Sequence, residues 1–258
     1  MERVVQSSAP IGSGPDPRRQ FDFTATARSH TGLVREHNED FVYAGHNLIA
    51  VADGVGGNVY GEIASELVVA AIAYLDDRNY LADPADEVRA AADQANMRLV
   101  AAIQENPELL GMATTLTALR LDGGSVIVLN VGDSRAYRVR DGVCRAITRD
   151  DSLVQDLLES GQITDAEALH HPLRSVVLQS LSGGPFRPTI GSLETVVGDR
   201  YLVCSDGLSD YVAEAEIARI LLAPEPPGWC CDALVEATLA AGAPDNVSCA
   251  VGDVAPLG

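Results

Sequence analysis

The sequence predicts an α+β fold in which antiparallel sheets are covered by pairs of helices. Alternating and apolar segments joined by Asp122-Gly123-Gly124 and Asp141-Gly142 indicate antiparallel strands, because such short turns join neighbouring antiparallel strands. Two pairs of consecutive helical segments lie within residues 61–102 and 214–241. Each helix has an apolar face, which must be buried against a sheet. With 258 residues the chain can bury one large core.

The N-terminal part divides into a leader and the start of the fold. Residues 1–20 are rich in Ser, Gly and Pro, which predicts a mobile leader and a folded domain over 21–258. Alternation over 21–28 predicts the first strand, and the apolar residues 49–52 predict the end of a buried strand with Asp53 at its tip. Gly54 lets the backbone turn sharply or approach a ligand closely. Taken alone, this segment is equally compatible with an ordinary Asp-Gly turn.

The helices of the first pair are recognised by their period and their start signals. Between 61 and 76, apolar residues recur at helical spacing. A second helix is predicted to begin at Asp83-Pro84, with a capping Asp and Pro at the first helical position, and to present Val88, Ala92, Ala95 and Leu99 on one face.

The rest of the chain alternates between strands and helices. Strands are predicted over 114–121, 125–131 and 136–139. A helical insertion over about 149–187 follows, because Ser152 and Thr164 begin capping-box patterns and Gly161 stands at a natural helix end. The remaining elements are predicted as strands over 189–197 and 199–205, helices over 214–222 and 229–241, and a last strand from Val247 to about Val254.

Three aspartates share one kind of position. Asp53, Asp206 and Asp245 each lie at the edge of a predicted strand, and they are far apart in the sequence. Carboxylate oxygens, with backbone carbonyls and water, suit Mg²⁺ or Mn²⁺, and no His adjoins these residues to favour zinc. The pattern predicts a site for a hard cation.

An ordered set of motifs carries a family resemblance. Together with the three aspartates, the chain contains Gly32-Leu33-Val34-Arg35, Asn38-Glu39-Asp40, Gly54-Val55-Gly56-Gly57, Gly111-Met112-Ala113-Thr114-Thr115 and Val131-Gly132-Asp133-Ser134-Arg135. Over roughly residues 24–253 it resembles the metal-dependent Ser/Thr protein phosphatases of type 2C in their bacterial form. The resemblance implies a four-layer α-β-β-α sandwich in which the 149–187 insertion is a flap over the site that contacts protein substrates.

The resemblance also implies metal ligands. Asp53 is expected to bridge two Mn²⁺ or Mg²⁺ ions and the Gly54 carbonyl to bind one of them. Asp206 and Asp245 are expected to bind the other ion, and Asp133 would join Asp206 at a weaker third site.

Three further residues receive roles in the reaction. The resemblance implies that Arg35 grips the substrate phosphate, for which a guanidinium is well shaped. The alternative is a surface Arg paired with Glu36 or with Glu39. Glu39 is expected to reach a metal ion through water, and Asp40 to lie near the nucleophile.

The expected reaction is attack of metal-activated water on a phosphoserine or phosphothreonine ester. It needs no Cys or Ser nucleophile, although Cys204 and Ser205 adjoin Asp206. The acid that protonates the leaving group stays open: Val55 and Asn58 stand where family members carry other residues, so a bound water or His171 remain candidates. His37, His46 and His170 are expected to be solvated loop residues.

Composition limits the partners. The formal net charge of −19 disfavours nucleic acid and anionic membranes. No apolar run approaches the roughly 18 residues of a membrane span and no signal peptide is recognised, so a cytoplasmic monomer is expected. It would act on phosphorylated proteins, among them a Ser/Thr kinase and its targets.

Other observations leave alternatives open. The five cysteines lack metal-site or disulfide spacing and are expected to be buried apolar residues. One alternative function is a pseudophosphatase that binds a phosphoprotein without turnover, and another is a metal-dependent hydrolase of small phosphate esters or nucleic acid.

Overall fold

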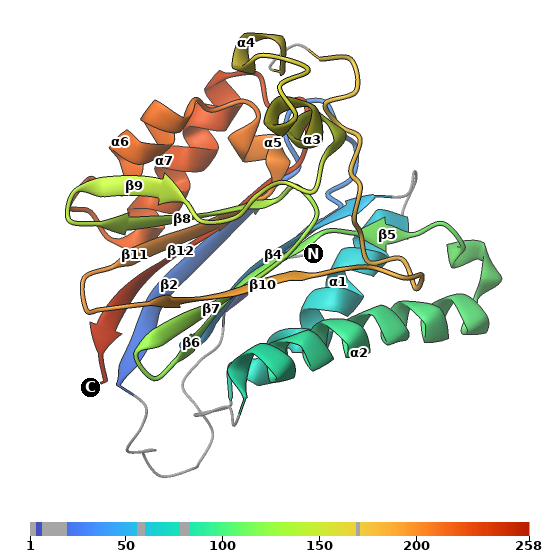
Figure 1. The fold of residues 1–258 in the computed structure, drawn as a ribbon, viewed down its shortest axis with the longest axis horizontal. Helices are drawn as coiled ribbons and strands as arrows, with labels where there is room; N and C mark the ends of the chain where they lie inside the picture. The colour runs from blue at the N-terminus through green and yellow to red at the C-terminus, as the bar shows by residue number, and fades with distance from the viewer. Residues whose placement is uncertain (1–3, 7–19, 56–59, 78–82, 169–170, 258) are drawn as a thin grey trace.

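Two β-sheets pack face to face and helices cover the outer face of each (Figure 1). The structure is a computed structural model and describes residues 4–6, 20–55, 60–77, 83–168 and 171–257. The four-layer α-β-β-α sandwich expected from the sequence is confirmed.

The first sheet runs in the order β1-β3-β4-β6-β7-β10, and the short β5 also pairs with β4. Its only parallel pair among the described strands is β1 with β3; the remaining pairs are antiparallel. The bounds are β1 Val4–Gln6, β3 Asp40–Ala44, β4 Leu48–Val55, β5 Ala113–Thr114, β6 Leu116–Asp122, β7 Ser125–Val131 and β10 Thr189–Glu194.

The second sheet runs in the order β2-β12-β11-β8-β9 and is antiparallel throughout its described strands. Its bounds are β2 Phe21–His30, β8 Arg135–Arg140, β9 Val143–Ala146, β11 Arg200–Cys204 and β12 Val247–Pro256. The turn at Asp141 and Gly142 joins β8 to β9 with φ of 51° and 74°, the positive values that a tight two-residue hairpin requires.

Helices α1 (Tyr60–Ile72) and α2 (Pro84–Glu105) cover the first sheet, and α6 (Glu214–Leu221) and α7 (Pro227–Ala240) cover the second. Short 3₁₀ turns follow α1 and α2, η1 over Ala73–Leu75 and η2 over Pro107–Leu109. Strand β4 shows how the layers form, because its alternate residues enter different cores. Leu48 and Ala50 pack under α1 and α2, whereas Ile49 and Val51 pack between the sheets.

The predicted helix starts are confirmed, one of them in part. The Asp83 carboxylate accepts a hydrogen bond from the Asp86 amide at 3.2 Å, with Pro84 at the first helical position. Thr164 and Glu167 form both bonds of a capping box at α4 (Asp165–Ala168). Ser152 caps α3 (Leu153–Glu159), but the Gln155 side chain bonds Glu159 instead of reaching back to residue 152.

The structure differs from the sequence expectations in several local respects, most of them at the ends of elements. Val4–Gln6, inside the expected leader, pairs with β3, while residues 1–3 and 7–19 lie outside the described residues. Strand β4 continues to Val55 because Gly54 and Val55 pair with β5. The strand expected over 114–121 is interrupted at Thr115, and β11 leads into the short helix α5 (Asp206–Ser209) rather than a turn.

The flap contains α3 and α4 and stands above one edge of the sandwich in Figure 1. All five cysteines are free; Cys144 is partly buried and the other four are buried, as expected. Within the described ranges, no helix has both the length and the apolar character to cross a bilayer.

Candidate metal centre

The ends of strands from both sheets meet at one edge of the sandwich. Asp53 lies near the end of β4, Asp206 begins α5 directly after β11, and Asp245 lies two residues before β12. Asp133 stands in the turn that carries the chain from β7 in one sheet to β8 in the other. Packing the sheets face to face therefore brings residues distant in the sequence to one place.

These residues face a pocket of about 340 Å³. Every predicted metal ligand lines it, as do Arg35 and Glu39. The remaining lining residues are Glu36, His37, Val55, Thr115, Ser175, Val177 and Asn246.

Asp40 lies beneath the pocket rather than in its wall. Its side chain is 1% exposed, and its backbone pairs with Asp53 across β3 and β4. The Ser205 hydroxyl donates a hydrogen bond to its Oδ2 at 2.7 Å. The structure thus places Asp40 behind the predicted bridging ligand.

The carboxyl groups at the pocket resist ionisation because they are buried and close to one another. Burial, opposed by the Ser205 hydrogen bond, raises the pKa of Asp40 to about 7. Burial and the neighbouring Asp210 raise the pKa of Asp206 to about 6. Burial, with Asp40 or Asp206 nearby, also raises the pKa values of Asp53 and Asp133 well above the usual range. Such a cluster has the charge and the oxygen donors that a divalent cation neutralises.

Arg35 stands at the rim of the pocket with its side chain 51% exposed. Its Nη2 donates a hydrogen bond to Asp245 Oδ2 at 2.8 Å. Its partner is therefore a predicted metal ligand, not Glu36 or Glu39, the partners considered for a surface Arg.

The predicted ligands are gathered but are not in coordination geometry. Within the part of the chain that is described, no three His, Cys, Asp or Glu side chains lie where they could jointly hold an ion. The donor chemistry nevertheless fits Mn²⁺ or Mg²⁺, since the aspartates offer carboxylate oxygens and Gly54 a carbonyl.

Two supporting residues were not predicted from the sequence. The Asn246 side chain donates to the backbone oxygens of Thr31 and His37 and accepts from the Glu39 amide, so it ties the Arg35 loop to Asp245. Thr115 Oγ1 accepts from the Asp53 amide at 3.0 Å. Thr115 belongs to a segment quoted as a motif and Asn246 follows Asp245 directly, but nothing local in the sequence indicates these distant partners.

Two glycines allow the backbone to pack closely at the pocket. A Cβ on Gly54 would overlap the backbone oxygen of Gly61 in the first turn of α1. A Cβ on Gly207 would overlap the backbone oxygen of Asn246. Only glycine lets these backbone segments approach each other this closely.

The histidines named in the sequence analysis differ in their exposure and in their distance from the pocket. His171 is absent from the pocket lining among the described residues, and its Nδ1 accepts from the Leu173 amide. His37 is exposed as expected but lines the rim. His46 is partly buried, which corrects the expectation of a solvated loop residue, because it lies in the tight β3–β4 connection. Asn58 and His170 lie outside the described residues, as do Gly56 and Gly57.

Two face-to-face sheets are flanked by helix pairs, and an acidic pocket lies where their strand ends meet. This is the arrangement that the resemblance to metal-dependent phosphatases implies. The chain belongs to the protein phosphatase 2C family, whose model matches residues 27–225.

Sequence relatives agree with this assignment. The serine/threonine protein phosphatase PstP of Mycobacterium tuberculosis is 46% identical over 88% of this chain. The chain covers 44% of that relative, and so spans less than half of its length. The serine/threonine phosphatase stp of Listeria innocua is 31% identical over 87% of this chain and 93% of its own length.

Solved structures show the same fold. A crystal structure of M. tuberculosis PstP matches with a TM-score of 0.87 and 45% identity, covering 90% of this chain and 98% of that one. The PstP catalytic domain in complex with two manganese ions matches with a TM-score of 0.85 and 43% identity, covering 91% and 99%.

Proposed function

We propose that this chain hydrolyses phosphoserine and phosphothreonine esters in proteins with two Mn²⁺ or Mg²⁺ ions, and a third possible, opposing a bacterial Ser/Thr kinase. One observation carries the proposal: Asp53, Asp133, Asp206 and Asp245 come from separate stretches and face one pocket, with Arg35 at its rim. The names of the relatives and the two manganese ions of the PstP complex support it.

The metal ligands of this proposal are Asp53, the Gly54 carbonyl, Asp206 and Asp245, with Asp133 beside Asp206 for a third ion. When bound, the ions supply an activated water and neutralise charge that develops on the phosphoryl oxygens. Asp53 suits a central position because β3 and Thr115 hold its backbone from two sides. Glu39 lines the same pocket, and burial raises its pKa.

The substrate side of the proposal rests on Arg35. Its guanidinium has five N–H donors, and among the described residues the Nη2 group bonds Asp245. Because Arg35 lies at an exposed rim, its fork can meet phosphate oxygens as a protein substrate approaches. Asp40 remains a positioning group behind Asp53, held by Ser205.

The broader predictions belong to the same proposal. They are a leader over 1–20, in which Val4–Gln6 pairs with β3, a catalytic domain over 21–258 with its flap at about 149–187, a cytoplasmic location and a monomeric state. Phosphorylated proteins, including a Ser/Thr kinase and its targets, are the proposed partners.

The test strips the protein with EDTA and measures hydrolysis of a phosphothreonine peptide and of p-nitrophenyl phosphate, with and without Mn²⁺ or Mg²⁺. We expect activity on both substrates that returns only with metal. Metal binding without turnover would contradict the proposal and identify a pseudophosphatase. Turnover of p-nitrophenyl phosphate without turnover of any phosphopeptide would identify a small-ester hydrolase.

A further inference from the structure

Arg135 links the loop that carries Asp133 to the entrance of the flap. It is the first residue of β8, two positions after Asp133. Its Nε donates to both oxygens of Asp150 at 3.0 Å, and its Nη2 donates to Asp150 Oδ2 at 2.6 Å. Asp150 lies just before α3, on the segment that enters the flap. The two side chains are 24% and 12% exposed, so solvent screens their attraction only in part.

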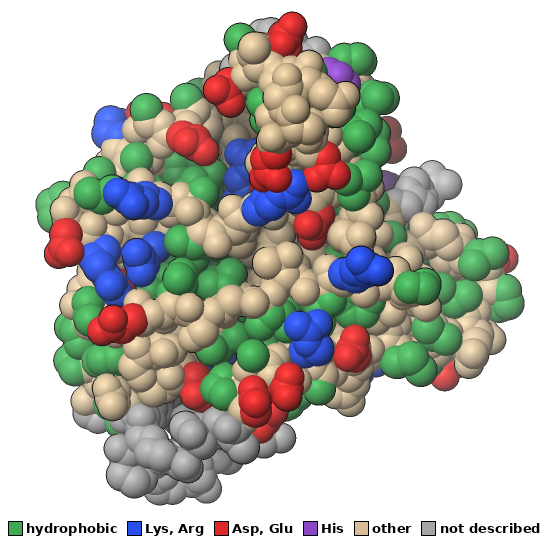
Figure 2. Space-filling view, viewed as in Figure 1, with side chains coloured by type: hydrophobic (Ala, Val, Ile, Leu, Met, Phe, Trp, Pro, Cys, Tyr) green, Lys and Arg blue, Asp and Glu red, His purple; other side chains and the backbone are tan. Residues whose placement is uncertain are grey.

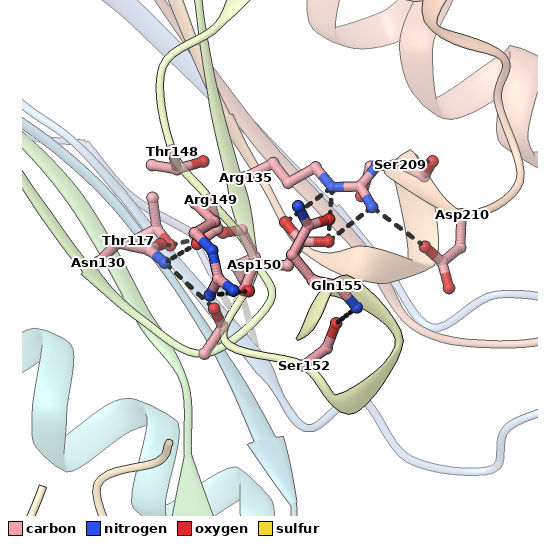
Figure 3. A network of polar contacts seen from close by, with 12 residues as sticks. Thr117, Asn130, Arg135, Thr148, Arg149, Asp150, Ser152, Gln155, Ser209 and Asp210 are labelled. Atoms are coloured by element: carbon pink, nitrogen blue, oxygen red, sulfur yellow. Dashed lines mark hydrogen bonds and ion pairs between the residues drawn. The ribbon is translucent and has the colours of Figure 1, made fainter. Parts of the chain in front are cut away.

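The same guanidinium also reaches the end of α5. Arg135 Nη1 donates to the backbone oxygen of Ser209 at 3.5 Å, and Nη2 lies 3.9 Å from Asp210 Oδ1. Figure 3 shows Arg135 between Asp150 on one side and Ser209 and Asp210 on the other. Because α5 begins at Asp206, one side chain contacts the segments of two predicted metal ligands and the flap entrance.

Hydrogen bonds continue from this point in both directions. Toward the flap, the Asp151 amide donates to the Gly132 oxygen at 2.9 Å, and the Gly132 amide donates to Asp151 Oδ2 at 3.1 Å. Toward the pocket, the hydroxyl groups of Ser134 and Thr115 are hydrogen-bonded at 2.9 Å, and Thr115 accepts from the Asp53 amide. A continuous set of contacts therefore joins Asp53 to the flap.

The flap entrance in turn positions a wall of the pocket. Its residues Asp151 and Leu153 exchange backbone hydrogen bonds with Leu178 and Val176 on the returning segment, at 2.7 and 3.0 Å. Residues 175 and 177 of that segment line the metal pocket. A shift of the entrance would therefore move the wall.

We propose that Arg135 is a positioning residue that holds the flap entrance, the Asp133 loop and the end of α5 in the arrangement the reaction requires. This inference rests on the proposed function for its kinetic consequence. Removing the guanidinium would leave Asp150 near Asp210 and Asp133 without the cation that lies between them, and repulsion among these carboxyl groups would loosen the flap entrance.

Arg140 is a matched control for a merely structural role. It lies at the other end of β8, its side chain is 25% exposed, and it forms a comparable forked ion pair, with Asp199. Arg140 is not among the described residues that line the pocket. Loss of either Arg should lower the melting temperature, but only loss of Arg135 should disturb the flap and the site.

The kinetic test compares Arg135→Ala, Arg135→Lys and Arg140→Ala at saturating Mn²⁺. We expect Arg135→Ala to lower kcat by about 10- to 100-fold, since small misplacements of reacting groups have effects of that size. Arg135→Lys should recover part of the loss, because Lys keeps the charge but not the fork. Arg140→Ala should keep kcat within about twofold. Equal effects of the two alanine variants on kcat would overturn the proposal.

Hydrogen exchange tests the same inference without substrate or turnover. Amides of Asp151, Leu153 and Leu178 should exchange faster in Arg135→Ala and at the wild-type rate in Arg140→Ala. An inactive wild type with this exchange pattern would count against the proposed function and support the coupling through Arg135. Unchanged flap exchange in Arg135→Ala would overturn the coupling, whatever the activity.

Discussion

Asp53 owes its position to contacts on both sides of its strand. Its backbone pairs with Asp40 in β3, and its amide and carbonyl bond the hydroxyl and amide of Thr115. The carboxylate is thus presented to the pocket from a fixed backbone. Replacing only its charge should leave that backbone in place.

We predict that Asp53→Asn abolishes metal-dependent turnover and leaves the fold intact. The amide keeps the shape of the side chain but loses the negative charge and one acceptor that a bridging ligand needs. Activity of the variant should be measured with Mn²⁺, and its melting temperature should stay within about 3 °C of the wild type in EDTA. Retained turnover would contradict the two-ion proposal.

Arg35 gives a prediction that separates binding from chemistry. Arg35→Ala should raise KM for a phosphopeptide about tenfold or more, with a smaller change in kcat, because it removes a phosphate contact at the rim. Arg28→Ala is the control, since Arg28 pairs with Asp232 at 2.6 Å and lies outside the pocket lining. An unchanged KM in Arg35→Ala would mean that Arg35 only pairs with Asp245.

At the scale of an element, the turn between β10 and β11 is organised by one buried carboxylate. Asp199 is 1% exposed and accepts hydrogen bonds from the Thr195 hydroxyl, the Val196 amide and Arg140 of β8. Burial opposes its charge, but Arg140 and these two donors outweigh that effect and lower the pKa of Asp199.

This lowered pKa gives a pH-dependent prediction. A carboxylate whose pKa is lower in the folded state stabilises the fold above its unfolded pKa, about 3.9, and that stabilisation is lost as the pH falls through the folded value. Asp199→Asn should therefore lower the free energy of unfolding at pH 7 by on the order of 2 kcal/mol, and the deficit should shrink below about pH 4. Denaturant melts at both pH values test this, and a deficit that does not change with pH would contradict it.

At the scale of the whole molecule, acidic charge is concentrated where metal is proposed to bind. The chain carries a formal net charge of −19, and burial together with neighbouring carboxyl groups raises the pKa values of Asp53, Asp133 and Asp206. Ions that bind the folded pocket and not the unfolded chain stabilise the fold by mass action.

We predict that Mn²⁺ raises the free energy of unfolding by about 2.7 kcal/mol when its concentration is 100 times its dissociation constant. Thermal melts after EDTA treatment, with and without Mn²⁺, measure the shift. Asp53→Asn should show a smaller shift at the same concentration, because it lacks the carboxylate that is proposed to bridge the ions. Equal shifts in both proteins would place the stabilising ions elsewhere.

Much of the fold was predictable because its signals are local. Alternation located β2, and a nearly continuous apolar run located β7. The Asp83-Pro84 cap located the start of α2, and turns rich in Asp and Gly marked the hairpins. The element ends were less predictable. Gly54 and Val55 continue β4 because β5, which lies some sixty residues later in the sequence, supplies the hydrogen bonds.

The residues of the candidate site likewise fall into those that the sequence indicated and those that it did not. Asp53, Asp206 and Asp245 could be found from strand-end patterns, and the motif order indicated Arg35, Glu39, Asp40 and Asp133. Asn246, Thr115 and the Arg135 contacts could not, since each depends on partners distant in the sequence that only the tertiary structure brings close.

By itself, the sequence determined which segments become strands and helices and which residues carry oxygen donors. It also determined that negative charges outnumber positive ones. These properties follow from side-chain chemistry and short-range backbone preferences. Only the tertiary structure decided that Asp40 lies behind Asp53, that Arg35 bonds Asp245, and that Arg135 joins the flap to the pocket. Contacts between residues distant in the sequence form when buried faces pack together, and no local pattern specifies which distant polar groups will meet.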